Sequence, residues 1–81
     1  MFVTVKLFAK LREIAGAGEV RLGLADNAVV RDAWLTLQAR YVGIAPYASS
    51  VSCAVNADYS RMSAPLREGD EVAFLPPVSG G

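Results

Sequence analysis

The sequence of 81 residues contains no histidine and only one cysteine, Cys53. The absence of histidine excludes Ser-His and Cys-His nucleophiles, His-containing zinc sites and the usual general base at neutral pH. A single cysteine excludes an internal disulfide and a multi-thiolate metal site. A small secreted domain held together by disulfides is therefore excluded, and the reducing cytoplasm is the expected location.

The chain also lacks an excess of charge and a long apolar run. Eight basic residues balance eight acidic residues, which disfavours nucleic acid or an anionic membrane as a partner. No segment reaches the ~20 apolar residues of a membrane-spanning helix, and charged side chains interrupt the apolar N-terminus, unlike a signal peptide. The composition, 53% hydrophobic and 20% charged, is typical of one small folded domain.

In the first half of the chain, the hydrophobic period changes from two residues to three or four. Residues 2–8 and 20–24 alternate apolar and polar side chains, which predicts two strands that pair antiparallel. Between them, residues 9–18 contain helix formers followed by glycines, which indicates one or two helical turns. A helix of about four turns follows, because apolar residues recur every three or four positions: Val30, Ala33, Trp34, Leu37 and Tyr41. Asp26 or Asn27 is expected to cap it.

The second half is predicted as a loop, a strand, a loop with a short edge strand, a turn and a last strand: residues 42–50, 51–57, 58–66, 67–70 and 71–75. Gly69 is expected to adopt positive φ in the turn. Pro76 and Pro77 end the last strand because proline donates no ladder hydrogen bond. The order indicates an α+β domain, with a mixed sheet of four or five strands packed on one long helix. A ubiquitin-like β-grasp fits best, and ferredoxin-like variants share this order.

The last six residues form the most unusual segment. We divide the chain into a domain over 1–75 and an extended tail over 76–81, in which Pro76 and Pro77 favour extension. Gly80 and Gly81 have no Cβ and can enter a channel that excludes side chains. A terminal carboxylate is a poor electrophile, whereas its adenylate accepts a sulfur or nitrogen nucleophile. By itself, however, a terminal Gly-Gly is a weak signal.

Three blocks give the tail a context: VKLFAKLREIAG (5–16), AVNADY (54–59) and LREGDEVAFLPPVSGG (66–81). In this order and spacing they resemble the small subunit of molybdopterin synthase. The helix block DNAVVRDAW departs from the pattern of that family. The resemblance implies a β-grasp sulfur carrier that is not catalytic alone but acts as a subunit of a sulfurtransferase.

The resemblance also implies the chemistry and the partners. An adenylating enzyme related to ubiquitin activators uses ATP to activate Gly81, and a sulfur donor protein converts the adenylate into a thiocarboxylate. The tail, comprising Pro76, Pro77, Val78, Ser79 and Gly80 before Gly81, then enters the large synthase subunit of a heterotetramer. There it donates sulfur to cyclic pyranopterin monophosphate to form the molybdopterin dithiolene. No cofactor or metal is expected on this chain.

Interface candidates surround the predicted tail. Phe8 follows three inward-facing residues as an outward aromatic, which suits a binding hot spot. Arg12 is a candidate rim contact. Leu75 is expected on an apolar docking patch if Phe74 faces the core, and the reverse assignment makes Phe74 the contact. Glu68 and Asp70 are expected beside the root of the tail, where solvated turn charges are the favoured interpretation and attraction of a basic partner is the alternative.

Two further questions concern sulfur. Cys53 alternates with valines, which favours a buried core position over a persulfide carrier. A sulfur carrier for thiamine synthesis or tRNA thiolation remains an alternative, as does a ubiquitin-like protein modifier, because all of them require the same adenylate.

Overall fold

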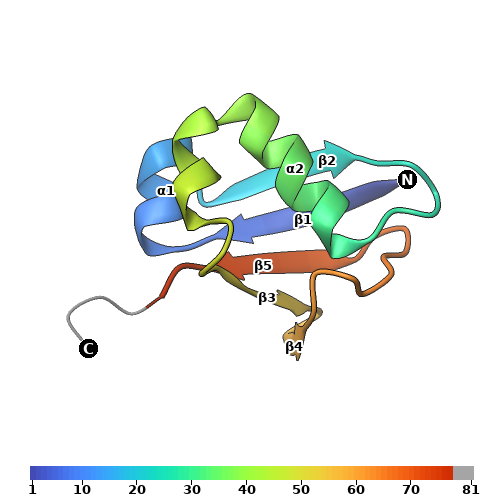
Figure 1. Ribbon diagram of the computed structural model, residues 1–81. Coiled ribbons are helices and arrows are strands. Elements are labelled where there is room, and N and C mark those ends of the chain that lie inside the picture. Colours follow the sequence, from blue (N-terminus) through green and yellow to red (C-terminus); the bar gives the residue numbers. More distant parts are fainter. Residues whose placement is uncertain (78–81) are drawn as a thin grey trace.

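The computed structural model describes residues 1–77, in which one long helix crosses one face of a mixed sheet (Figure 1). The elements in chain order are β1 (Phe2–Leu7), α1 (Ala9–Ala15), β2 (Glu19–Gly23), α2 (Val30–Arg40), the 3₁₀ helix η1 (Val42–Tyr47), β3 (Ser52–Val55), β4 (Asp58–Ser60) and β5 (Glu71–Leu75). The five strands lie in the order β2-β1-β5-β3-β4. The predicted α+β class and the short edge strand are therefore confirmed.

The centre of the sheet is a parallel pair formed by the first and the last strand of the chain, β1 and β5. In β1 and β5, Val5 lies opposite Val72 and Leu7 opposite Phe74. β2 pairs antiparallel with β1, as predicted, while β3 pairs antiparallel with β5 and carries β4 at the edge. Because β1 and β5 run in the same direction, the segment after β1 and the segment after β5 leave the sheet at the same end.

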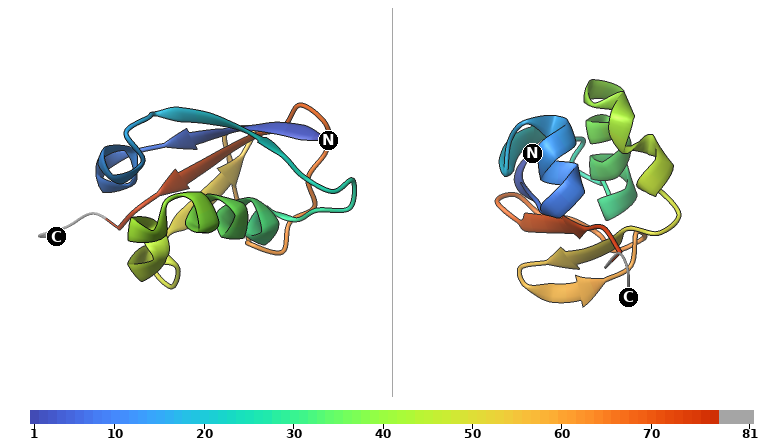
Figure 2. Two further views of the ribbon diagram at one scale, coloured as in Figure 1. Left: turned by 90° about the horizontal axis from the view of Figure 1, so that it is seen from above. Right: turned by 90° about the vertical axis from the view of Figure 1, so that its left-hand side faces the viewer.

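Alternate residues of the central strands build the core against α2. The side chains of Val5, Val72 and Phe74 are fully buried, and Trp34 of α2 is 2% exposed. The rings of Trp34 and Phe74 meet edge to face, with centroids 5.1 Å apart and planes at 70°. Such aromatic pairs contribute about 1 kcal/mol beyond their buried area. Figure 2 shows α2 as a layer on one side of the sheet, which leaves the other side without a covering helix.

The start of α2 differs from the prediction. Neither Asp26 nor Asn27 caps the helix; its N-cap is Val29, which has no side-chain acceptor. Instead, the backbone N–H of Val29 donates to Oδ2 of Asp32 at 2.8 Å, and the N–H of Asp32 donates to the carbonyl of Val29 at 2.9 Å. The carboxylate of Asp32, three residues after the N-cap, thus accepts the hydrogen bond of the N-cap N–H. It also lies at the positive end of the helix dipole.

The segment after α2 also differs from the prediction, because residues 42–47 form the helix η1 instead of a loop. Ile44 of η1 is fully buried in the core. η1 lies so close to α1 that a Cβ at Gly43 would come within 2.9 Å of Cγ2 of Ile14. Six residues are too few to show a helical period in the sequence, so η1 becomes evident only from its packing in the structure.

Candidate functional site

The root of the tail lies at the end of β5. Ladder pairing continues to Leu75, which lies opposite Ser52 of β3. Pro76 is half-buried and Pro77 is exposed, so exposure increases along the chain after the strand ends. The other tail candidates, Val78, Ser79, Gly80 and Gly81, lie outside the described residues.

A hollow of about 460 Å³ adjoins this root. Its walls come from the start of α1, from the end of η1 and from the two prolines, and its lining residues are Ala9, Lys10, Glu13, Tyr47, Pro76 and Pro77. Three segments that are distant in sequence therefore meet beside the point where the tail begins. One cation and one anion lie among mostly apolar walls.

The uncovered side of the sheet carries an apolar patch next to the same root. Ala54 lies opposite both Tyr59 of β4 and Ala73 of β5, so the three residues share a face. Leu75 lies two residues beyond Ala73 on this face, and Phe8 follows the end of the neighbouring strand β1. We call these five residues, Phe8, Ala54, Tyr59, Ala73 and Leu75, the outer patch. Phe8 is 44% exposed and Tyr59 is 79% exposed.

Tyr59 was missed by the sequence reasoning, although a signal was present. The two residues between β3 and β4, Asn56 and Ala57, both have positive φ, at 49° and 73°, which is typical of a two-residue hairpin turn. Such a turn places residue 59 opposite residue 54. The AVNADY block therefore determines which face Tyr59 occupies, once it is read as a hairpin.

The structure decides between the two face assignments for β5. Phe74 is fully buried against Trp34, so the candidate interface role of Phe74 is wrong. Leu75 points to the outer side and is half-buried, in agreement with the first assignment. Arg12 is exposed on α1, and its guanidinium carbon would lie 3.1 Å from a Cβ placed on Gly18.

The acidic candidates do not lie beside the tail. Glu68 and Asp70 precede β5 whereas Pro76 follows it, so a whole strand separates them from the root (Figure 1). Glu68 accepts a hydrogen bond from the N–H of Phe2 at 3.0 Å. Asp70 accepts one from the N–H of Arg67 at 2.8 Å and one from the amide of Asn56 at 3.0 Å. The predicted position of this acidic cluster is wrong, because the strand direction carries the tail to the opposite end.

Cys53 occupies the core, as predicted. It is 4% exposed, and its thiol donates to the carbonyl of Ser60 at 3.1 Å. Burial raises the pKa of the Cys53 thiol above its ordinary value of 9.0. A thiol that is both buried and protonated is a poor nucleophile.

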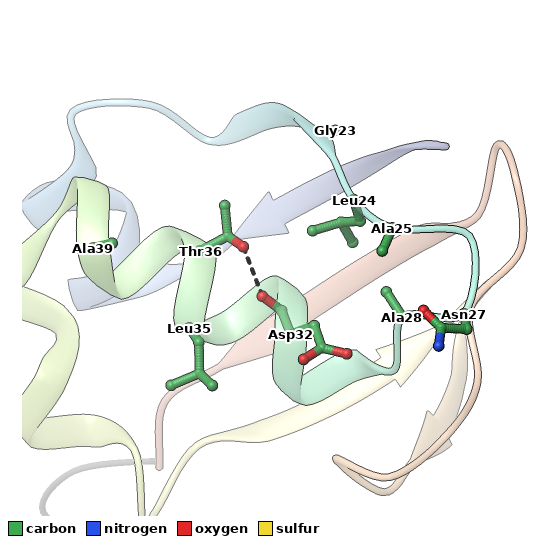
Figure 3. A pocket seen from close by; sticks show the side chains of 9 residues that line it. All are labelled: Gly23, Leu24, Ala25, Asn27, Ala28, Asp32, Leu35, Thr36 and Ala39. Carbon is green, nitrogen blue, oxygen red and sulfur yellow. Dashed lines mark hydrogen bonds between the residues drawn. The ribbon is translucent and has the colours of Figure 1, made fainter.

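A second hollow, of about 760 Å³, lies between α2 and the segment that follows β2 (Figure 3). Two of its polar side chains have partners: Asp32 accepts from the N–H of Val29, and the hydroxyl of Thr36 donates to the carbonyl of Asp32 at 2.8 Å. Asn27 is the other polar side chain in the lining. Leu24 and Leu35 supply apolar lining. Over residues 1–77, no group of His, Cys, Asp and Glu is suited to hold a metal ion, and no helix is long and apolar enough to cross a membrane.

The parallel central pair, the strand order and the helix across one face define a ubiquitin-like β-grasp protein. A model of the ThiS family matches residues 5–81, and the chain belongs to this family.

Relatives and solved structures agree with this assignment. The molybdopterin synthase sulfur carrier subunit of Chlamydomonas reinhardtii is 36% identical, and the match covers all of both chains. Small archaeal modifier protein 1 of Haloferax volcanii is 34% identical, over 94% of this chain and 97% of the relative. The crystal structure of SAMP1 from Haloferax volcanii superimposes over all of both chains with a TM-score of 0.90 and 29% identity.

One solved neighbour is part of an assembly. It comes from the protein–protein complex of subunits 1 and 2 of the molybdopterin-converting factor from Helicobacter pylori. It covers all of both chains, with a TM-score of 0.70 and 24% identity, and shares the fold with this chain.

Proposed function

We propose that this protein is the sulfur carrier subunit of molybdopterin synthase, with Gly81 as its reacting residue. The observation that supports this most is that the family match runs through residue 81 and so includes the Gly-Gly end. The molybdopterin synthase sulfur carrier subunit of Chlamydomonas reinhardtii, aligned over all of both chains, supports the same function. The chain is a reactant presented to enzymes and works in the cytoplasm.

The chemistry begins with a carboxylate that is a poor acyl donor. A carboxylate oxygen of Gly81 attacks the α-phosphate of ATP in an adenylating enzyme, and pyrophosphate leaves. The outer sulfur of a persulfide on a donor protein then attacks the acyl carbon, and AMP leaves. A thiol cleaves the resulting acyl disulfide, so that the thiocarboxylate is released and the donor sulfur ends in a disulfide with that thiol. In the large synthase subunit, that sulfur passes to cyclic pyranopterin monophosphate, and two such transfers form the dithiolene.

The geometry at the root suits this division of labour. Pro76 and Pro77 donate no ladder hydrogen bonds, so the strand ladder ends at Leu75. Next to it, the outer patch exposes two aromatic side chains, Phe8 and Tyr59, beside the half-buried Ala73 and Leu75. We assign this patch to the docking of the large subunit, because exposed aromatic residues are typical of binding hot spots. The partners then supply the acids and bases that this chain lacks.

The direct test is the intact mass of the chain after incubation with the adenylating enzyme, ATP and a sulfur source. We expect the mass gain for one oxygen replaced by sulfur, located by fragmentation at Gly81. Deletion of Gly81 should abolish the gain while the unfolding transition stays the same. Cys53→Ser should load sulfur normally, and sulfur found on Cys53 would overturn the proposal.

The pathway needs a second measurement. The loaded chain, a large subunit and the pyranopterin precursor should together yield molybdopterin. If sulfur loads but no dithiolene forms with any large subunit, a carrier role in thiamine synthesis or tRNA thiolation is favoured instead.

A second candidate function is protein modification, favoured by the 34% identity to small archaeal modifier protein 1. In that case the adenylate is attacked by a lysine amine of a target. A lysine-linked adduct, in place of the sulfur-loaded chain, would identify this activity.

A further inference from the structure

The chain has few amines that an activated acyl group can modify. Only two of its eight basic residues are lysines, Lys6 and Lys10, and the other six are arginines. A guanidinium stays protonated and is a poor nucleophile, whereas a lysine amine attacks acyl carbons once it is deprotonated. The amines of this protein are therefore Lys6, Lys10 and the α-amino group of Met1.

Two of these three amines are engaged. Nζ of Lys6 lies 2.9 Å from Oε1 of Glu19 across the β1–β2 pair. This hydrogen bond and the nearby charges of Glu19 and Glu71 raise the pKa of Lys6, so it stays protonated. The amino group of Met1 donates to the carbonyl of Leu24 at 2.7 Å and to Oδ1 of Asp26 at 3.3 Å, while its side chain is 5% exposed.

Lys10 differs from both. It is exposed at the start of α1, and among residues 1–77 no carboxylate lies within ion-pairing distance of its ammonium. It also lines the hollow at the root of the tail, together with Glu13, Tyr47, Pro76 and Pro77. The amine thus lies beside a concave and mostly apolar surface with one carboxylate in its wall, where a slender acyl chain can lie against the protein.

We propose that Lys10 is the site at which this protein is acylated by the activated C-terminus of a second copy of itself. Nζ of Lys10 attacks the acyl carbon of the adenylate at Gly81 of the other copy. A C–N bond forms, the C–O bond to AMP breaks, and the proton from the amine goes to solvent. The product is an isopeptide-linked dimer, formed with ATP consumed by the adenylating enzyme.

The hollow suits the tail of another copy better than the tail of the same copy. Gly81 comes four residues after Pro77, and Pro77 is itself part of the wall. A reversal within so short a segment after two prolines is stiff and costly. A Gly-Gly end from another molecule enters without such a reversal, and the hollow of about 460 Å³ has room for these two small residues.

The test is incubation of the purified full chain with the adenylating enzyme and ATP, without a sulfur source. We expect a species with the mass of two chains less one water, in which fragmentation links Gly81 to Lys10. Lys10→Arg keeps the charge and should lower the yield of this dimer at least about tenfold. Lys6→Arg is the matched control and should leave the yield unchanged.

Contrary outcomes are equally definite. A linkage at Lys6 or Met1, a single chain that has lost one water, or a dimer that persists in Lys10→Arg would each overturn the assignment. The inference rests on the adenylation step of the proposed function, so each sample is also tested with the sulfur source. Sulfur loading without any dimer would refute only the role of Lys10, whereas failure of both reactions would count against the proposed function.

Discussion

At the scale of single residues, several side chains and backbone positions are held in conformations that only their neighbours explain. Asn56 has a φ of 49°, and its side chain compensates by donating to Asp70 and accepting from the N–H of Glu71, both at 3.0 Å. Ala57, at a φ of 73°, has no polar side chain with which to compensate. Its left-handed conformation costs ~1–2 kcal/mol.

Ala57→Gly should therefore stabilise the protein by about 1 kcal/mol, because glycine adopts positive φ without a Cβ clash and Asn-Gly suits this hairpin turn. Denaturant unfolding measures the change. Ala48→Gly is the matched control: Ala48 is exposed with a φ of −53°, and its replacement should destabilise the protein by roughly 0.5–1 kcal/mol. An equal effect of both changes would show that backbone conformation is not the cause.

Cys53 gives a pH-dependent prediction. Because burial raises the pKa of its thiol above 9.0 in the folded chain, the unfolded chain loses this proton first as the pH rises. The contribution of Cys53 to stability is then complete below pH 9.0 and declines above it. The difference in unfolding free energy between the wild type and Cys53→Ser should be constant from pH 6 to 8 and shrink at pH 10. A constant difference throughout would contradict the assignment.

At the scale of elements, the points at which helices begin and end are less evident from the sequence than their hydrophobic periods. The apolar period of α2 identifies its buried face, yet its cap comes from Asp32 inside the helix and not from the polar residues before it. η1 has no period of its own, and its buried Ile44 and its contact with α1 define it. Ends depend on individual hydrogen bonds, whereas periods depend on many residues together.

Asp32→Ala should destabilise the protein by about 1 kcal/mol, since it removes the acceptor for the N–H of Val29 and a favourable charge in the first turn. Asn27→Ala is the control and should change stability by less than about 0.5 kcal/mol, because this side chain does not cap. Thermal and denaturant unfolding both report the difference. A larger loss of stability in Asn27→Ala than in Asp32→Ala would show that Asn27 caps the helix, as the sequence predicted.

At the scale of the whole molecule, one sheet separates the core from the face that we propose for docking. One face and α2 hold the only sizeable core among the described residues, and the other face carries the outer patch beside the root of the tail. A domain of this size buries only ~60% of the surface of its unfolded chain. It therefore has little stability to lose on the core side, while the outer side is free to be apolar for binding.

Phe74 and Leu75 are adjacent in sequence and test this separation. Phe74→Ala should cost about 3–5 kcal/mol, because it opens a cavity against Trp34, and it should largely unfold so small a domain. Leu75→Arg should leave the unfolding midpoint nearly unchanged but weaken binding to the large subunit about 30-fold or more. Thr36→Arg on α2 is the control for added charge. Intact binding in Leu75→Arg, measured by calorimetry, would remove the outer patch from the interface.

The sequence by itself determined the order of the strands and of α1 and α2, the buried face of α2, the buried position of Cys53 and the likeness of the tail to a sulfur carrier. These features depend on periodicity and local motifs, which are properties of neighbouring residues. It did not determine which face Phe74 occupies, because alternation is symmetric and either face satisfies it until α2 covers one of them.

The tertiary structure alone decided what lies beside the tail. The parallel pairing of β1 with β5 brings Phe8 and the start of α1 to Pro76, and carries Glu68 and Asp70 to the other end. It also places Lys10 in the hollow. The hairpin turn sets Tyr59 opposite Ala54, and only the pairing of β3 with β5 brings this pair beside Ala73. These neighbours come from distant parts of the chain, and only the direction and register of paired strands bring such residues together.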